Sequence, residues 1–483
     1  MKKIIILFSL ATFIIAFSGC KKFLDEKPQT EISSTEFWKS EDDIKTGLAA
    51  MYDGLQTTFN NNYVLYGDVR TDEVDVNQYG DDAFVVNALS ATTGAADWTN
   101  FYTAIARANL GLKYIPIVKS TYQIGIDQKV INHYLAQCYT TRALAYFWIV
   151  RLWGDAPVWT APYENLSENP NRERTAAQLI IDTLIIKDLE KAALLANPAL
   201  NSVYEGNIGA TYALLMDVAM WNKNYPKAIE WYNKLTGLNK YSLEPRTNWK
   251  TIFTDPATTK EAIWHLNWDW TVDGGARVSQ LIGAGETNSD FMAEDSVWNY
   301  WTDPAIRYVD IRGGQTIDTN VANHDKFPKF YPVNLNANKQ QIYPNSAEAN
   351  VKFPLYRWAD ILLLRAEAAN KLNDVTGALN FLNQVRARAG YTVPYTAITL
   401  PTMIARENAI LEERKLELYM EAKRWFDLVR TDKVIEVMDP YIKQRQIQRA
   451  SPPVGFGDPR TILWPLHRTV LNSNPSLVQN PPY

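Results

Sequence analysis

The stretch RALAYFWIVRLWGDAP, residues 142–157, completes one of the long helices that the sequence predicts. The helical pattern starts at about Lys129, and Gly154-Asp155-Ala156-Pro157 stops the helix after Trp153. Another helix follows Ser40-Glu41-Asp42-Asp43, which has the form of a capping box. Further helices are expected at about 98–118, 175–195, 207–222, 226–236, 357–372, 375–389 and 402–430. These patterns predict a mainly α-helical protein.

Two of these stretches have the pattern of helix-turn-helix units. Residues 210–235 place small and aromatic residues where two helices would cross, and residues 359–389 repeat this around an Asn373-Asp374 turn. Such spacing is typical of stacked tetratricopeptide pairs. We therefore expect degenerate tetratricopeptide-like helical pairs, and an ordinary antiparallel helical bundle is the alternative.

The composition narrows the classes of function. Apolar residues make up 46% of the 483 residues, which supports a large buried core. The balance of 49 basic and 53 acidic residues argues against nucleic acid as a partner. Four histidines and two cysteines are too few for a zinc framework or a disulfide scaffold. The 16 tryptophans and 26 tyrosines exceed the needs of a core and suggest a ligand surface.

Four common enzyme signatures are absent from the sequence: G-x-S-x-G, H-E-x-x-H, a Walker loop and a Rossmann glycine fingerprint. We therefore expect no catalytic residues, no metal and no cofactor. A carboxylate pair for glycoside hydrolysis need not be close in sequence. A secreted glycoside hydrolase thus stays open as an alternative.

The first 19 residues are expected to be a signal peptide. Two lysines precede the apolar run 4–17, which is too short to span a bilayer. The motif FSGC at residues 17–20 resembles a bacterial lipoprotein box, although its phenylalanine replaces the usual aliphatic residue. We expect Cys20 to be acylated and to anchor the mature chain, whereas an ordinary secretory signal is the alternative.

Residues 240–355 differ in texture from the helical blocks on either side. They are rich in Gly, Asn, Asp, Pro and Trp, and they predict loops with a few short strands, one of them at residues 261–267. A loop of that length in a compact protein usually has a function. We expect one compact unit made of an N-terminal helical region, residues 20–239, a loop-rich insert, residues 240–355, and a C-terminal helical region, residues 356–483.

Tryptophans are concentrated in this insert. An indole face complements the axial C–H groups of a sugar ring, while Asp, Asn and Arg bind the hydroxyls. We expect exposed indole faces to bind a glycan at Trp268, Trp270, Trp298 and Trp301. The alternative is that these indoles fill a small core, and we prefer that interpretation for Trp264.

A second candidate patch lies in the first long polar connection. The run GDVRTDE at residues 67–73 is followed by Asn77, Tyr79 and two further aspartates, and Trp98 comes soon after. The carboxylates could bind calcium, but their spacing is not that of an EF-hand. A solvated acidic loop and polar contacts to a sugar are the other interpretations. We assign Asp72, Asn77, Tyr79 and Trp98 to the second side of the ligand site.

The most charged helix is expected around residues 411–430. Its opposite charges at i,i+3 spacing predict the pairs Arg414–Glu417 and Glu421–Arg424. We interpret it as a structural helix whose charges tie neighbouring helices together.

Five motifs follow one another over nearly the whole chain. They are FLDEKP at 23–28 with Phe37-Trp38, the stretch 142–157, RWADILLL at 357–364 with AEA at 366–368, EER at 412–414 with RWFDLVR at 424–430, and LWPL at 463–466 with NP at 474–475 and QNPPY at 479–483. With these motifs the chain resembles the SusD/RagB family of outer-membrane nutrient-capture lipoproteins. Pro482 replaces an expected glycine, and Val470 lies near a position that is often acidic in the family.

The resemblance implies a SusD-like fold of tetratricopeptide-like pairs with a loop-rich face that binds glycan or, in some members, peptide. It implies a non-catalytic protein that is lipid-anchored at the cell surface. Its partner would be a SusC-like TonB-dependent transporter of the outer membrane, to which it delivers the glycan. A helical-repeat adaptor that binds only proteins is a further alternative. The ligand residues differ among family members, so the candidates above depend on loop chemistry alone.

Overall fold

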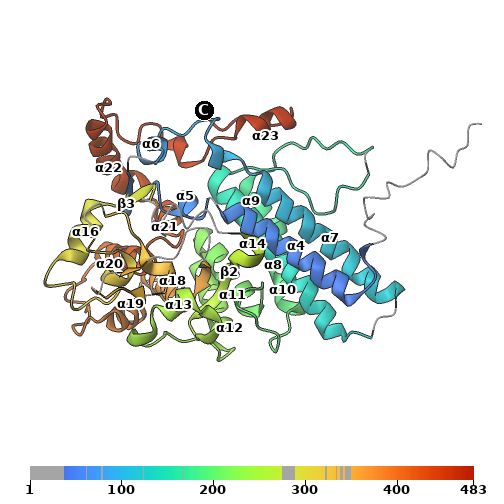
Figure 1. The fold of residues 1–483 in the computed structure, drawn as a ribbon, viewed down its shortest axis with the longest axis horizontal. Coiled ribbons are helices and arrows are strands. Elements are labelled where there is room, and N and C mark those ends of the chain that lie inside the picture. The colour runs from blue at the N-terminus through green and yellow to red at the C-terminus, as the bar shows by residue number, and fades with distance from the viewer. Residues whose placement is uncertain are drawn as a thin grey trace, which may run out of the picture.

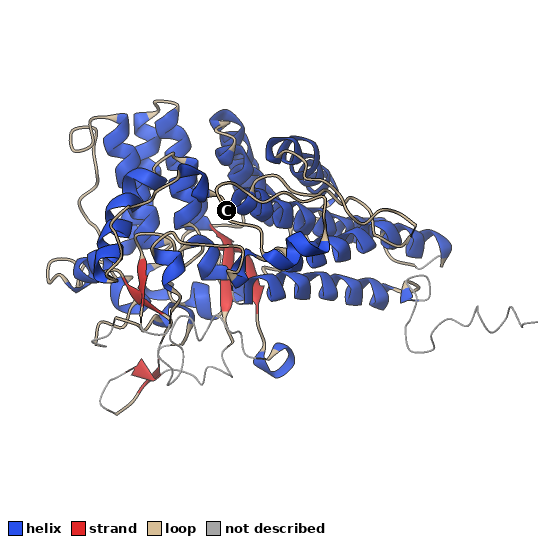
Figure 2. Cartoon of the chain, turned by 90° about the horizontal axis from the view of Figure 1, so that it is seen from above, coloured by secondary structure: helices blue, strands red, loops and turns tan. Residues whose placement is uncertain are grey.

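The computed structural model describes residues 37–60, 62–77, 80–122, 125–165, 167–274, 289–320, 324–332, 334–337, 341–342 and 350–483. Helices dominate these residues and the strands are short, which confirms the predicted fold class (Figures 1 and 2). The predicted anchor Cys20 and the predicted site residue Tyr79 lie outside the described residues. Among the described residues, no helix is both long enough and apolar enough to cross a membrane.

Long helices from the first half of the chain pack side by side. They are α4 (Glu41–Asn60), α7 (Thr99–Thr121), α8 (Gln128–Trp153) and the run α9 (Ala177–Ile180), η2 (Ile181–Ile185) and α10 (Ile186–Leu195) (Figure 1). The predicted capping box is present, because the Ser40 amide donates to Asp43 Oδ2 at 2.7 Å and the Asp43 amide donates to Ser40 Oγ at 3.2 Å. Gly154 ends α8 in the left-handed region, with φ at 74°.

Two helical pairs follow, α11 (Ile208–Trp221) with α12 (Tyr225–Thr236), and α18 (Trp358–Lys371) with α19 (Val375–Ala389). Their turns are built alike. Lys223 and Asn373 are both left-handed, and the next side chains, Asn224 and Asp374, accept the N-cap hydrogen bonds of the second helices. Helices α12 and α18 also pack against each other, so the two pairs stack as expected for tetratricopeptide-like units.

The charged helix predicted over residues 402–430 is interrupted. Helix α20 spans Met403–Glu417 and α21 spans Arg424–Arg430. Between them lies a connection, residues 418–423, with left-handed Met420 and Ala422. The amides of these two residues donate to buried carboxylates of Glu73 and Asp68. Long-range hydrogen bonds therefore override the local helical pattern.

The strands form three antiparallel pairs. Apart from the first strand in the chain, each of these strands belongs to the insert or its boundary. Strand β1 (Val74–Val76) pairs with β3 (Phe291–Ala293), β2 (Ala262–Asn267) with β6 (Lys352–Arg357), and β4 (Asn334–Leu335) with β5 (Gln341–Ile342). The predicted strand at 261–267 is thus confirmed.

Apart from the 15-residue helix α22 (Val434–Gln448), short helical elements fill the connections between the longer ones. They are α5 (Tyr63–Gly67), α6 (Asp82–Val85), η1 (Gly94–Ala96), η3 (Arg246–Asn248), α13 (Thr251–Thr254), η4 (Pro256–Thr258), α14 (Trp270–Asp273), α16 (Asp295–Thr302), α17 (Gly313–Thr316), η5 (Pro328–Phe330), η7 (Pro459–Ile462) and α23 (Arg468–Ser473). One large apolar core joins residues from both halves of the chain. A smaller cluster around Trp38 and Tyr114 closes the outer end of α4, α7 and α8.

Candidate functional site

The acidic stretch 67–73 is buried, so the interpretation as a solvated loop is wrong, and so is the separate prediction that Asp72 binds the ligand. Arg424 donates to both oxygens of Asp72, at 2.8 and 2.9 Å, and Lys415 Nζ lies 3.3 Å from Oδ2. Burial opposes ionisation of Asp72, but the two cations outweigh it and hold the pKa well below its ordinary value. Asp72 therefore anchors the C-terminal helices and faces no ligand.

The same stretch approaches the connection 418–423 closely. A Cβ on Gly67 would lie 2.3 Å from the Ala422 backbone, so only glycine fits there. Asp68 and Glu73 then accept the amides of Ala422 and Met420 at 2.9 and 3.4 Å. The carboxylates that suggested a binding loop are thus used to hold a distant segment of the chain.

Three of the predicted indoles are core residues. Trp98, Trp268 and Trp301 are exposed by only 4%, 2% and 1%. They pack edge-to-face on Trp153, Phe353 and Tyr419, with ring centroids 5.9, 5.7 and 5.3 Å apart. The expectation that each exposes a face is therefore wrong, because tertiary packing covers each of these indoles with an aromatic ring from a distant part of the chain. Trp264 is fully buried, as we expected.

The other two indoles remain accessible. Trp270 begins α14 and is 39% exposed, and its amide donates to Asn350 Oδ1 at 2.8 Å. Trp298 on α16 is partly buried and stacks on His324, with ring centroids 3.6 Å apart and planes at 11°. Burial lowers the pKa of His324 below its ordinary value, so its ring is a neutral aromatic partner at pH 7.

The β1–β3 ladder brings the two predicted patches together. Val74 faces Ala293 and Val76 faces Phe291. Beyond the ladder, the Asn77 amide donates to the Asp290 carbonyl at 3.0 Å, and Asn77 Nδ2 lies 3.4 Å from Asp325 Oδ2.

The neighbouring residue His324 contacts the same ladder, because the Ala293 amide donates to its carbonyl at 2.9 Å. Residues 324–325 therefore contact both β3 and Asn77, which brings the Trp298–His324 stack and Asn77 to the same two-stranded ladder. Sequence patterns could not show this juxtaposition, since β1 and β3 are far apart in the chain.

Two clefts flank the ladder. Cleft A has a volume of about 620 Å³ and is lined by residues of α5, α6, η1, the start of α7 and β3, among them Asp81, Asp97, Asn100 and Asp290. Cleft B has a volume of about 400 Å³ and is lined by Asp75, Asn77, Asp82, Glu294, Asp295 and Arg449, among others. Both volumes are typical of small-ligand sites. Trp298 follows Asp295 by three positions on α16, so the stack lies beside cleft B.

Hydrogen bonds position the polar side chains around the clefts. Asp97 accepts the Thr99 amide at 2.8 Å at the start of α7, and Asp81 accepts the Ala83 amide at 2.9 Å at the start of α6. In cleft B, Arg449 Nη2 lies 2.8 Å from Asp75 Oδ1. These contacts leave carboxylate and amide groups on a preorganised surface that suits the hydroxyls of a ligand.

A third groove, of about 880 Å³, lies between α4, α8 and α14. Tyr52, Tyr134, Glu205 and Val272 are among its lining residues. Trp270 begins α14, whose Val272 and Asp273 line this groove, and neither Trp270 nor Trp298 is among the lining residues of any of the three cavities. We favour clefts A and B because the β1–β3 ladder brings Asn77 and the α16 residue Asp295 together at cleft B.

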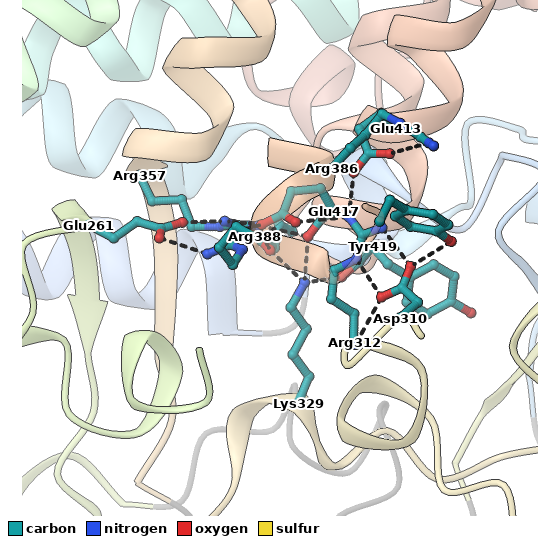
Figure 3. Close-up of polar contacts among 12 residues, drawn as sticks. Glu261, Asp310, Arg312, Lys329, Arg357, Arg386, Arg388, Glu413, Glu417 and Tyr419 are labelled. Carbon is teal, nitrogen blue, oxygen red and sulfur yellow. Dashed lines mark hydrogen bonds and ion pairs between the residues drawn. The ribbon is translucent and has the colours of Figure 1, made fainter. Parts of the chain in front are cut away.

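A buried charge network holds the segment that carries the stack (Figure 3). Arg312 binds Asp310, Glu413 and Glu417 at 2.7, 2.7 and 2.9 Å. Lys329 binds Glu421 and donates to the Tyr419 carbonyl at 2.8 Å. The network therefore fixes both ends of the segment between Arg312 and Lys329, which includes His324.

The network extends to strand β6 through Arg357, which binds Glu261, Glu417 and Glu421 at 2.8, 2.6 and 2.7 Å. The prediction that charges of this helix tie elements together is confirmed, but the predicted i,i+3 pairs are wrong. Arg414 binds Asp360 and Asp427 instead, and Glu417 and Glu421 bind Arg357. Because these groups are fully buried, they are out of reach of a substrate. In the part of the chain that the structure describes, no cluster of side chains could hold a metal ion.

Comparisons with known proteins cover almost the whole chain. A family model described as "SusD family" matches residues 239–483, and a model described as "Starch-binding associating with outer membrane" matches residues 22–220. The chain is 28% identical to the SusD-like protein P38 of Formosa agariphila, over all of this chain and 99% of the relative. It is 24% identical to a SusD-like protein of Bacteroides ovatus, over 87% of this chain and 81% of the relative.

Solved structures share the fold. A SusD homolog from Bacteroides thetaiotaomicron has a TM-score of 0.77 at 20% identity, covering 94% of this chain and 99% of the other. NanU of B. fragilis has a TM-score of 0.74 at 20% identity, with 95% and 100% covered. A laminarin-binding SusD-like protein has a TM-score of 0.72 at 22% identity, with 92% and 100% covered.

Proposed function

The chain belongs to the SusD family, and from this premise we propose that it is a non-catalytic glycan-binding protein of the outer membrane. It binds an oligosaccharide or polysaccharide at clefts A and B and delivers it to a SusC-like TonB-dependent transporter. The Trp298–His324 stack is the observation that carries the assignment, since Trp298 lies about one helical turn after Asp295, a lining residue of cleft B. A flat, neutral aromatic pair next to carboxylate and amide groups suits a sugar ring, whose C–H face and hydroxyls need both. The laminarin-binding protein of the same fold supports this class of ligand.

The test is titration calorimetry of the purified chain with a panel of oligosaccharides that includes starch and laminarin fragments. We expect saturable binding to at least one member of the panel and no release of reducing ends. Reducing ends that appear at enzymatic rates would instead support the glycoside hydrolase. Absence of binding to any glycan, together with binding to peptides or to a partner protein, would overturn the assignment.

We propose that Cys20 carries the lipid anchor. The Cys20→Ala variant removes the thiol that would be acylated, so the chain should leave the outer-membrane fraction when the transporter is absent. Fractionation of wild type and variant, each without the transporter, measures this. A variant that still sediments with the outer membrane would contradict lipid anchoring while leaving glycan binding intact.

A further inference from the structure

Clefts A and B are both lined by an excess of acidic side chains. Cleft A has Asp81, Asp97 and Asp290 among its lining residues. Cleft B has Asp75, Asp82, Glu294 and Asp295. The ladder β1–β3 lies between these two sets, so a glycan that extends across the ladder would meet both of them.

The basic residues near the clefts are already paired. Among the described residues that line the two clefts, Arg449 is the one cation, and it binds both Asp75 and Asp82. Glu294 is held by the buried Arg445. An anionic ligand would have to break one of these pairs to gain a counter-charge.

Three other carboxylates of the clefts have no lysine or arginine partner among the described residues. They are Asp81, Asp97 and Asp295, and the imidazole of His467 lies 3.9 Å from Asp97. The Asp81 and Asp97 carboxylates each accept one backbone amide, and Asp97 also accepts the Thr469 hydroxyl at 3.3 Å, so neutral donors position both groups. Each can still accept hydrogen bonds from sugar hydroxyls through its remaining lone pairs.

From this charge distribution we propose that the site selects neutral, hydroxyl-rich glycans and rejects chains that carry uronate or sulfate groups. The inference rests on the proposed glycan-binding function and adds the ligand class. Fixed like charges in a cleft with low-dielectric walls repel an anionic chain, and such repulsion is an effective source of specificity. Hydroxyl groups can donate to the same carboxylates, so a neutral chain gains where a charged chain loses.

The experiment compares one neutral oligosaccharide that binds with the same oligosaccharide carrying 6-sulfate groups. Calorimetry at about 20 mM salt should give at least about tenfold weaker binding for the sulfated chain. The difference should shrink at about 0.5 M salt, because salt screens the repulsion, while the affinity for the neutral chain should change little.

A charge variant separates repulsion from steric exclusion by the sulfate group. In the double variant Asp81→Asn/Asp97→Asn, each amide oxygen can still accept the backbone amide that the carboxylate accepts, at the N-cap of α6 and just before α7. The ratio of neutral to sulfated affinity should fall at least about threefold at low salt. The matched control Asp127→Asn/Asp182→Asn removes two exposed charges that do not line the clefts, one of them an N-cap as well, and should leave the ratio unchanged.

Each outcome is decisive. A sulfated chain that binds as tightly as the neutral one overturns the proposed selectivity and leaves glycan binding standing. If the ratio of neutral to sulfated affinity changes neither with salt nor in the double variant, the proposed selectivity is also overturned, because the shape of the sulfate group and not its charge would cause the difference. Failure of every glycan to bind, neutral or charged, would instead contradict the proposed function itself.

Discussion

Two alanine substitutions within one helix should separate the binding surface from the core. Trp298 and Trp301 lie three positions apart on α16. Trp298 is partly buried on His324, whereas Trp301 is 1% exposed and packs on Tyr419 and against Gly313. Trp298→Ala should therefore cost affinity, and Trp301→Ala should cost stability.

The magnitudes follow from these surroundings. Truncating a buried tryptophan costs about 3–5 kcal/mol of the free energy of unfolding. An unfolding entropy of about 2.1 cal/mol/K per residue amounts to about 1 kcal/mol/K for a chain of 483 residues, so Trp301→Ala should lower the Tm by about 3–5 °C. Loss of the Trp298 stack removes one aromatic pair, worth about 0.5–1.5 kcal/mol, which lowers the Tm by about 1 °C. A ligand-stacking aromatic contributes about 1–2 kcal/mol of affinity, so Trp298→Ala should weaken glycan binding about 5–30-fold.

Thermal melts and calorimetric titrations well below both melting temperatures give the two quantities. Tyr308→Ala is the control, because this aromatic is 77% exposed on the same segment and its loss should change neither. The reasoning would be refuted if Trp298→Ala lowered the Tm as much as Trp301→Ala while the glycan affinity stayed unchanged.

Two further predictions concern the buried acidic stretch. Asp72→Asn leaves Arg424 buried without its counter-charge, so urea denaturation should show that the free energy of unfolding falls by about 3–5 kcal/mol, while the folded variant keeps its glycan affinity. If the variant instead loses glycan affinity and keeps its stability, Asp72 is a ligand residue. Burial raises the pKa of Asp68 to about 8, so the folded protein keeps a proton that the unfolded chain releases near pH 4. The free energy of unfolding should therefore fall as the pH rises from 6 to 8, by at most about 1.4 kcal/mol per pH unit. Asp68→Asn cannot ionise, so its urea midpoints should decline less over this range, and parallel declines in the two proteins would contradict the assignment.

Elements that depend on local patterns could be predicted from the sequence. The capping box at Ser40, the end of α8 at Gly154 and the turn at Asn373 are each determined by a few neighbouring residues, and the structure has all three. The two helical pairs could also be predicted from local patterns, because the spacing of their small and aromatic residues reflects contacts between helices that are adjacent in the sequence.

The errors arise where distant segments meet. The helix break at residues 418–423 and the burial of Asp72 have the same cause, because residues 67–73 pack against the segment that joins α20 to α21. Neither of these two segments has a local sequence pattern that predicts this contact. Tryptophan content indicated an aromatic ligand surface but could not distinguish Trp298 from Trp301, because their burial depends on the partners His324 and Tyr419. Burial of an indole is a property of the tertiary packing, and residue type alone does not reveal it.

The contact between residues 67–73 and the connection 418–423 also bears on how the molecule assembles. Its hydrogen bonds join residues more than 340 positions apart, and loops of that length are slow to close during folding. The stretch 67–73 leads directly into β1, and β1 needs β3 from the insert as its partner. Helices α4, α7 and α8 contact one another within residues 41–153, whereas cleft A needs residues 290–291 and cleft B needs residues 448–449 as well. A chain that ends before α22 would therefore keep these helices and lack one wall of cleft B.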